Sequence, residues 1–311
     1  MKRVPSLVLA AGAVLATLLA LEMAVRVALP QDMAFFDGSA IKRRSEQPGF
    51  RYELIPGGYA PRYVGVPVSV NRLGLRDREV DVPKPRHTVR VLGVGDSVTF
   101  GYGVRLEETY LKILEGKLGE GARGGRRYEV VNAGVEECGL DAYDHAVRTL
   151  APRLEADLVL VGIVLNDIQR YDDLEHPARR REASLEPGLA RRAHGALLAR
   201  SQLYHASVLA ARSLLYRFHV LDVADLYGSP LRAVRQEGAP IERAWASSLG
   251  VLERLVAAAR ARRLSVVFVV FPVEVQLDEA AIARYRRDFG VSVPARALDG
   301  EPQRRLLAFG A

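Results

Sequence analysis

Residues 89–101 have the sequence VRVLGVGDSVTFG. The first six residues are apolar or glycine except for Arg90, and Gly95 ends the run. A short apolar run of this kind is typical of a strand that is buried on both faces of a parallel sheet. Because the chain turns directly after the strand, we expect the Ser97 hydroxyl at its carboxyl end. Parallel sheets bind their ligands at that edge.

Strand and helix patterns alternate along the rest of the chain. Further strands are predicted at residues 128–131, 157–165 and 264–271, and helices at residues 107–118, 140–154, 189–218, 244–262, 280–289 and 303–309. Strands that alternate with helices favour an α/β fold with a parallel sheet covered on both faces. The connections are expected to be right-handed crossovers.

The N-terminus has the pattern of a membrane anchor. Lys2 and Arg3 precede an uncharged run of 18 residues, 4–21, which is the lower limit for a spanning helix. A cleaved signal peptide is the alternative, but no cleavage point has small residues at both −3 and −1. We therefore predict a transmembrane signal anchor over residues 1–30. The expected location is a bacterial cell membrane, crossed once, with the folded part on the periplasmic or extracellular side.

The composition excludes several classes of protein. The net charge is +7, but nearly all of the positive charge is arginine, and no nucleic-acid-binding motif accompanies it. We therefore expect no nucleic-acid partner, and we interpret the arginines as codon bias in a GC-rich genome. The single cysteine excludes an internal disulfide framework. No residue set has the spacing of a metal or cofactor site, so neither is expected.

Two further strand ends carry groups that suit acyl transfer. Gly134 follows the second predicted strand and offers a backbone N–H without a side chain to cover it. Asn166 follows the third strand and offers a neutral side-chain donor. Each motif alone also fits an ordinary turn. A hydroxyl at Ser97 beside donors from two neighbouring strand ends is the arrangement that acyl transfer needs.

These segments resemble the conserved blocks of the SGNH/GDSL hydrolases. Residues 95–99 (GDSVT) resemble the first block, residues 132–134 (NAG) the second and residues 162–167 (GIVLND) the third, which supplies the asparagine. Three residues separate Gly162 from Asn166, where the usual spacing is one. Residues 71–77 (NRLGLRD) resemble a segment of membrane-anchored members.

The resemblance implies a flavodoxin-like three-layer α/β/α fold. It also implies Ser97 as the nucleophile, with the oxyanion held by the backbone N–H groups of Ser97 and Gly134 and by the side chain of Asn166. Asp96 is then a structural neighbour of the serine. Three parts are expected along the chain: the anchor, a juxtamembrane linker with short strands over residues 31–86, and a hydrolase-like domain over residues 87–311 with a helical insertion at about 180–262.

The catalytic base is the piece that the resemblance does not supply. The family carries it in an Asp-x-x-His block near the C-terminus, but the last histidine of this chain is His219. A truncated chain is the explanation that we expect. The alternatives are a binding protein without turnover, and a relocated base in the segment Asp173-Leu174-Glu175-His176, which matches Asp-x-x-His literally.

The function expected from these observations is that of a serine esterase. It would act through a Ser97 acyl-enzyme on an O-acyl ester, such as an acetyl ester, of an envelope glycan or lipid. The alternatives are an O-acyltransferase that modifies a cell-surface polysaccharide, and a non-catalytic binding protein of the same fold.

Overall fold

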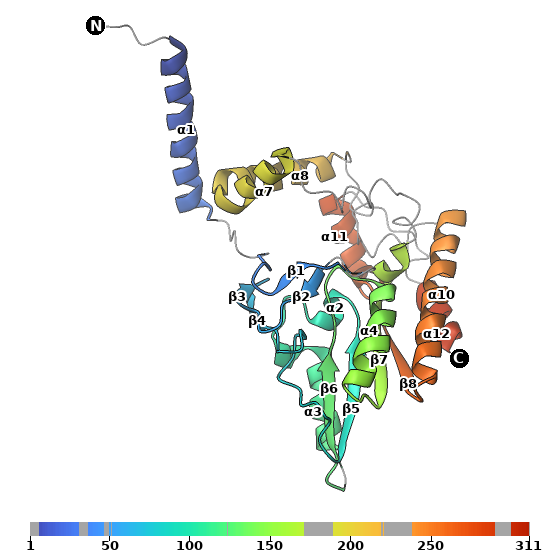
Figure 1. Cartoon of the computed structure of the whole chain (residues 1–311). Coiled ribbons are helices and arrows are strands. Elements are labelled where there is room, and N and C mark those ends of the chain that lie inside the picture. Colours follow the sequence, from blue (N-terminus) through green and yellow to red (C-terminus); the bar gives the residue numbers. More distant parts are fainter. Residues whose placement is uncertain are drawn as a thin grey trace.

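The N-terminal helix projects away from the sheet, and residues near its C-terminal end contact the segment 200–203 (Figure 1). The computed structural model describes residues 6–30, 37–46, 50, 52–122, 124–170, 189–218, 220, 238–289 and 300–310. Helix α1 covers Ser6–Ala28, and its segment Val8–Ala28 is long and apolar enough to cross a membrane. None of that segment is buried against the rest of the protein.

Four parallel strands form the central sheet in the order β6-β5-β7-β8. They are β5 (Thr88–Val94), β6 (Arg127–Asn132), β7 (Leu158–Val164) and β8 (Ser265–Phe271). By position along the chain this order is 2-1-3-4, which is the flavodoxin-like arrangement. The strand order reverses between β5 and β7, so the ligand crevice of such a sheet lies at their carboxyl ends.

Arg90 interrupts the apolar run of β5 and is nevertheless fully buried. Its guanidinium donates to the carbonyl of Leu154 at 2.7 Å and to the carbonyl of Asp81 at 2.9 Å. It also forms an ion pair with Glu129 of β6, with an N–O distance of 2.6 Å. A buried arginine is tolerated because these partners satisfy its donors.

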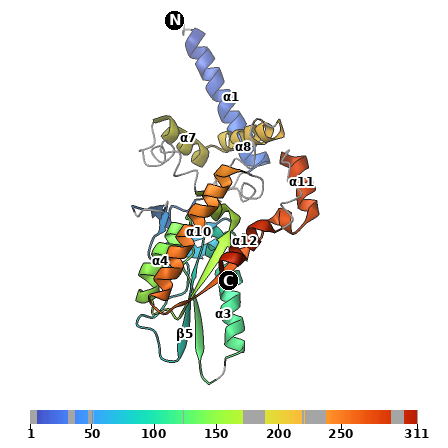
Figure 2. The ribbon, with the colours of Figure 1, turned by 90° about the vertical axis from the view of Figure 1, so that its right-hand side faces the viewer.

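Helices cover both faces of the sheet (Figure 2). On one face, Leu111 of α3 (Tyr110–Glu120) packs against Val91, Val130 and Leu160. The other face carries the larger core beneath α4 (Leu140–Arg153) and α10 (Ala239–Arg260). The three-layer α/β/α architecture expected from the sequence is therefore confirmed.

The helical segment between β7 and β8 divides into two parts. Helices α7 (Leu189–Arg200) and α8 (Gln202–Arg217) lie near the end of α1, away from the sheet (Figure 1). Helix α10 instead buries Trp245, Leu252 and Leu255, which share one helix face, in the main core. The predicted insertion over 180–262 thus ends before α10, because α10 is the crossover helix that leads into β8.

The region between the anchor and β5 forms two small antiparallel hairpins. Strand β1 (Lys42–Arg44) pairs with β2 (Tyr52–Leu54), and β3 (Tyr59–Tyr63) pairs with β4 (Val66–Ser69). Ile41, Tyr63 and Val68 form a small core that closes over Phe100. The short strands expected between residues 31 and 86 are therefore present, and they pack against the segment that carries Ser97.

The remaining elements lie after the helical turn 97–100 and after β8. They are η1 (Leu106–Glu108), η4 (Glu274–Gln276), α11 (Glu279–Phe289) and α12 (Glu301–Gly310). Helix α12 packs beside β8 through Phe309, whose ring centroid lies 5.8 Å from that of Phe268.

Candidate active site

Ser97 begins a single helical turn, α2 (Ser97–Phe100), directly after β5. The Asp96 side chain caps this turn by accepting a hydrogen bond from the Val98 N–H at 2.9 Å. Gly101 ends the turn in the left-handed region, with φ of 90°. Thr99 and Phe100 are buried, whereas Ser97 remains partly accessible. The turn is therefore held by its inner face and presents its serine outward.

Glycines on three strand ends make room for this turn. A Cβ atom at Gly95 would lie 1.9 Å from Thr99 Oγ1, and one at Gly162 would lie 2.5 Å from the same atom. A Cβ atom at Gly134 would lie 2.3 Å from the Phe100 backbone nitrogen. Real atoms do not approach so closely, so any side chain at these positions would displace the turn. Gly162, whose role the motif spacing left open, thus provides space for Thr99.

Ser97 and Asn166 meet at one carboxylate oxygen. Ser97 Oγ donates to Asp96 Oδ2 at 3.4 Å, and Asn166 Nδ2 donates to the same oxygen at 3.3 Å. Asn166 lies in η2 (Leu165–Arg170), the turn that follows β7. Both bonds are long, as catalytic hydrogen bonds often are without substrate. Ser97 and Asn166, the predicted nucleophile and side-chain donor, are therefore neighbours at the carboxyl ends of β5 and β7.

Asp96 is a buried carboxyl group at the centre of this cluster. Burial raises the pKa of Asp96 above its usual value, and hydrogen bonds from Val98, Asn166 and Ser97 oppose that rise. The carboxylate thus holds the serine and the asparagine in place. This position fits the structural role that the family resemblance implies for it.

The Gly134 amide is engaged within the protein. It donates to Asn132 Oδ1 at 2.9 Å, and Asn132 Nδ2 donates to the Phe100 carbonyl at 3.3 Å. The unshielded N–H expected from the sequence therefore has a partner in this structure. A role for Gly134 in binding an oxyanion requires that the substrate share or replace the Asn132 oxygen. Sequence reasoning missed Asn132, whose signal was its place two residues before a glycine at a strand end.

The segment 71–77 contacts the C-terminal end of α2 through Arg76. The guanidinium of Arg76, which is 1% exposed, donates to the carbonyls of Phe100 at 2.7 Å and Val104 at 2.5 Å, and also to that of Gly101. It lies 4.7 Å from the Phe100 ring centroid. Because these carbonyls follow the last turn of α2, Arg76 supplies donors that the helix itself lacks there.

Asp77, in the same segment, holds the end of β6. Its carboxylate accepts from the Asn132 N–H at 2.7 Å and forms a buried ion pair with Lys112 of α3, with an N–O distance of 2.7 Å. The neighbouring Asn71 folds the segment by accepting from the N–H groups of Leu73 and Leu75, each at 3.0 Å. The segment 71–77, which the sequence identified only by its resemblance to membrane-anchored hydrolases, thus connects α2, β6 and α3.

Glu136 links the N-terminal hairpins to the loop after β6. Tyr63 Oη donates to Glu136 Oε2 at 2.5 Å, and Lys42 Nζ forms an ion pair with the same oxygen at 2.8 Å. The Tyr63 ring also packs edge-on against Tyr102, with a centroid separation of 5.9 Å. These contacts fasten β1 and β3 to the loop that follows β6.

The structure does not identify a base for Ser97. Across the ranges that it describes, the hydrogen bond of Ser97 Oγ goes to Asp96, and none goes to a histidine. The segment Asp173–His176 lies outside the described residues. Asp167, which follows Asn166, accepts from Tyr143 Oη at 2.8 Å and from the Val164 N–H at 3.0 Å, so it stabilises the turn. Among the described residues, no group of three or more metal-ligating side chains occurs.

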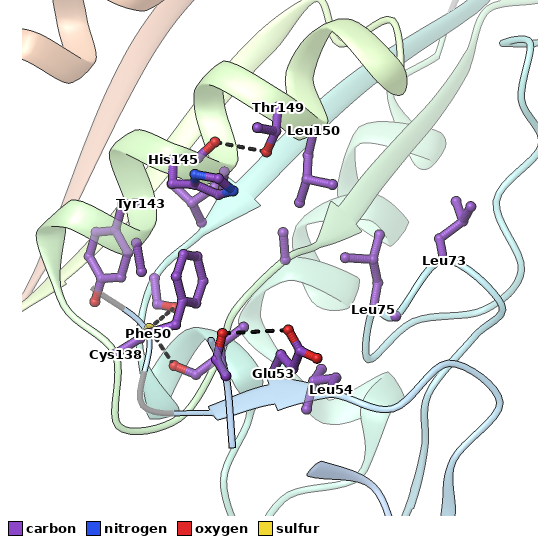
Figure 3. A pocket seen from close by; sticks show the side chains of 18 of the residues that line it. Phe50, Glu53, Leu54, Leu73, Leu75, Cys138, Tyr143, His145, Thr149 and Leu150 are labelled. Carbon is purple, nitrogen blue, oxygen red and sulfur yellow. Dashed lines mark hydrogen bonds between the residues drawn. The ribbon is translucent and has the colours of Figure 1, made fainter. Parts of the chain in front are cut away.

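A cavity of about 440 Å³ lies between α4 and the β1–β2 hairpin (Figure 3). Its lining includes Gly95 but not Ser97. The Phe50 ring packs edge-on against His145 with a centroid separation of 5.3 Å, and Cys138 Sγ contacts the Val135 carbonyl at 2.7 Å. His145 and Cys138 therefore pack in the wall of this cavity.

Gly134→Ala is expected to destabilise the protein by about 3 kcal/mol, because the new methyl group collides with the backbone of α2. The colliding atoms belong to the backbone, so they cannot move aside as the end of a flexible side chain could. Gly116→Ala is the matched control. Gly116 lies in α3 with no heavy atom within 4 Å of its would-be Cβ, so alanine should stabilise the helix by about 0.5–1 kcal/mol. Urea unfolding monitored by Trp245 fluorescence measures both, and equal effects would contradict this role of Gly134.

Comparison with known proteins gives weak similarities to esterases. No protein-family model and no curated protein matches the chain. Among solved structures, AlinE4, an SGNH-hydrolase family esterase, is 20% identical over 72% of this chain and 95% of its own, with a TM-score of 0.29. A catalytic mutant of Axe2, an acetylxylan esterase from Geobacillus stearothermophilus, is 19% identical over 72% and 94%, with a TM-score of 0.28. TesA is 18% identical over 55% and 98%, with a TM-score of 0.24. Such TM-scores do not establish a common fold, so the fold assignment depends on the strand order and the helical layers.

Proposed function

We propose that the chain is a serine esterase of the SGNH/GDSL type that α1 anchors in a bacterial cell membrane. One observation carries the proposal: Ser97 and Asn166 share Asp96 Oδ2 at the crevice between β5 and β7, while the Gly134 backbone touches the turn that bears the serine. A hydroxyl with donors from adjacent strand ends supports acyl transfer better than phosphate or dinucleotide binding, because the glycine spacing fits neither motif.

The reaction proceeds in two steps. Ser97 Oγ attacks the ester carbonyl carbon, its proton passes to a base, and the alcohol leaves with a proton. Water then hydrolyses the acyl-enzyme and releases the carboxylic acid. The Asn166 amide turns from Asp96 to the developing oxyanion, beside the backbone N–H groups of Ser97 and Gly134. This step needs a general base, and among the described residues the hydrogen bond of Ser97 Oγ goes to Asp96 and not to a histidine.

The substrate that we propose is an O-acyl ester, such as an acetyl ester, on an envelope glycan or lipid. The membrane anchoring proposed for α1 supports this choice, and so does the partial exposure of Ser97. A transferase would use the same serine and pass the acyl group to a sugar hydroxyl, so the two activities differ only in the acceptor.

Acetate release separates these activities. The full chain in detergent micelles, given an acetylated oligosaccharide, is expected to release free acetate. Addition of an unacetylated oligosaccharide should leave that release unchanged if water is the acceptor. Transfer of the acetyl group to the added sugar, detected by mass spectrometry, would replace the esterase with the transferase. If neither free acetate nor an acetylated acceptor is formed, the proposed function is contradicted.

A further inference from the structure

The end of α1 is fastened to the turn between α7 and α8. The Glu22 carboxylate accepts from Ser201 Oγ at 2.8 Å and from the N–H groups of Gln202 and Leu203, each at 3.0 Å. Arg26 forms an ion pair with Glu22 at 2.7 Å and donates to the Arg200 carbonyl at 2.9 Å. Glu22 therefore caps the N-terminus of α8, and Arg26 binds a carbonyl at the end of α7.

This attachment fixes the level of the α7–α8 hairpin along α1. The uncharged part of α1, residues 6–21, spans about 24 Å, which is most of the hydrocarbon thickness of a bilayer. Glu22 is the first charged residue after that run, so it marks the boundary between hydrocarbon and headgroups. In both views α7 and α8 run across the direction of α1 at this end (Figures 1 and 2). The hairpin thus lies where a membrane spanned by α1 would have its surface.

The composition of the hairpin suits that place. Residues 189–218 contain five arginines and no aspartate or glutamate. Several of their large apolar side chains are exposed, namely Leu189, Leu197, Leu209, Leu214, Leu215 and Phe218. Helices rich in arginine with exposed apolar residues lie in the interfacial plane of membranes, where the arginines meet anionic headgroups and the apolar residues enter the acyl boundary.

We propose that the α7–α8 hairpin is an interfacial membrane element that binds the anionic surface of the bilayer spanned by α1. This inference depends on the membrane anchoring proposed above and adds a second contact with the lipid. The Glu22 and Arg26 contacts hold the α7–α8 hairpin beside α1, so the hairpin stays at the level of the membrane surface.

Fluorescence quenching by brominated lipids tests this inference. The full chain is reconstituted in nanodiscs that contain phosphatidylglycerol, with a tryptophan introduced by Leu214→Trp or Phe218→Trp. Ile113→Trp, on α3 at an exposed position, is the matched control. Brominated lipid should reduce the added fluorescence of the two hairpin variants at least about threefold and leave that of Ile113→Trp nearly unchanged. The buried Trp245 contributes a constant background.

A third variant separates the two possible failures. Leu15→Trp places the probe within α1, where it should be quenched if α1 spans the bilayer. Quenching of Leu15→Trp without quenching at 214 or 218 would overturn the interfacial hairpin alone and favour a protein partner or a free surface. The absence of quenching at all three positions would overturn the membrane anchor and this inference together. Replacement of phosphatidylglycerol by phosphatidylcholine should weaken quenching at 218 and not at 15.

Discussion

Ser97→Ala is expected to lower kcat/KM for p-nitrophenyl acetate by a factor on the order of 10⁴–10⁶. The reason is that in the proposed reaction the Ser97 oxygen forms the covalent bond to the acyl group. Among the described residues, the Ser97 side chain makes one hydrogen bond, which is 3.4 Å long, and the side chain is partly exposed. The free energy of unfolding should therefore change by less than about 0.5 kcal/mol.

The control for this experiment is Ser69→Ala. Ser69 is exposed at the end of β4, so the activity of this variant should stay within about twofold of the parent protein. Steady-state hydrolysis by the full chain in detergent, with urea unfolding in parallel, gives both quantities. A Ser97→Ala variant that retains activity would exclude the serine as nucleophile. A loss of activity with an equal loss of stability would leave only a structural role.

Arg76→Met is expected to have the largest effect among substitutions outside the reacting groups. Methionine keeps much of the length of the side chain but donates no hydrogen bonds, so the Gly101 and Val104 carbonyls lose the buried donors that Arg76 gives them. An unsatisfied buried polar group costs about 1–3 kcal/mol, so we expect a destabilisation of about 2–4 kcal/mol. Esterase activity should fall as well, because these carbonyls fix the end of the turn that begins at Ser97.

Arg72→Met is the matched control from the same segment. The Arg72 side chain is 66% exposed, and its ion pair with Glu79 lies in solvent. Such pairs contribute little, so the free energy of unfolding should stay within about 0.5 kcal/mol of the parent value. Urea unfolding and ester hydrolysis measured on both variants give the comparison. Equal stability of the two variants would show that the buried contacts of Arg76 do not hold α2.

The sheet could be predicted largely because β5, β7 and β8 are short and mostly apolar runs, whereas β6 also contains Arg127 and Glu129. Position after a strand was enough to bring Ser97 and Asn166 to the same edge, since the carboxyl ends of parallel strands lie together. The role of α10 could not be predicted in this way. Its amphipathic pattern fits a lid as well as a core helix, and only the packing of Trp245 against the sheet distinguishes them.

The contacts that hold the site in place could not be predicted from the sequence either. Arg76 stands in a segment rich in glycine and charge, where arginine is normally solvated, and its carbonyl partners lie 24 to 28 residues later in the chain. Nothing local indicates such contacts. The amide of Gly134 was expected to face the ligand, but the Asn132 side chain reaches it through a short local bond. Side chains compete locally for backbone N–H groups, and the spacing of residues in the sequence does not predict which side chain binds which group.

The most direct test of the nucleophile is covalent labelling of the full chain with a fluorophosphonate, followed by peptide mapping. The account predicts a single phosphonyl adduct on the peptide that contains Ser97, and no adduct in the Ser97→Ala variant. An adduct on a different residue, or equal labelling of the parent protein and the variant, would contradict it.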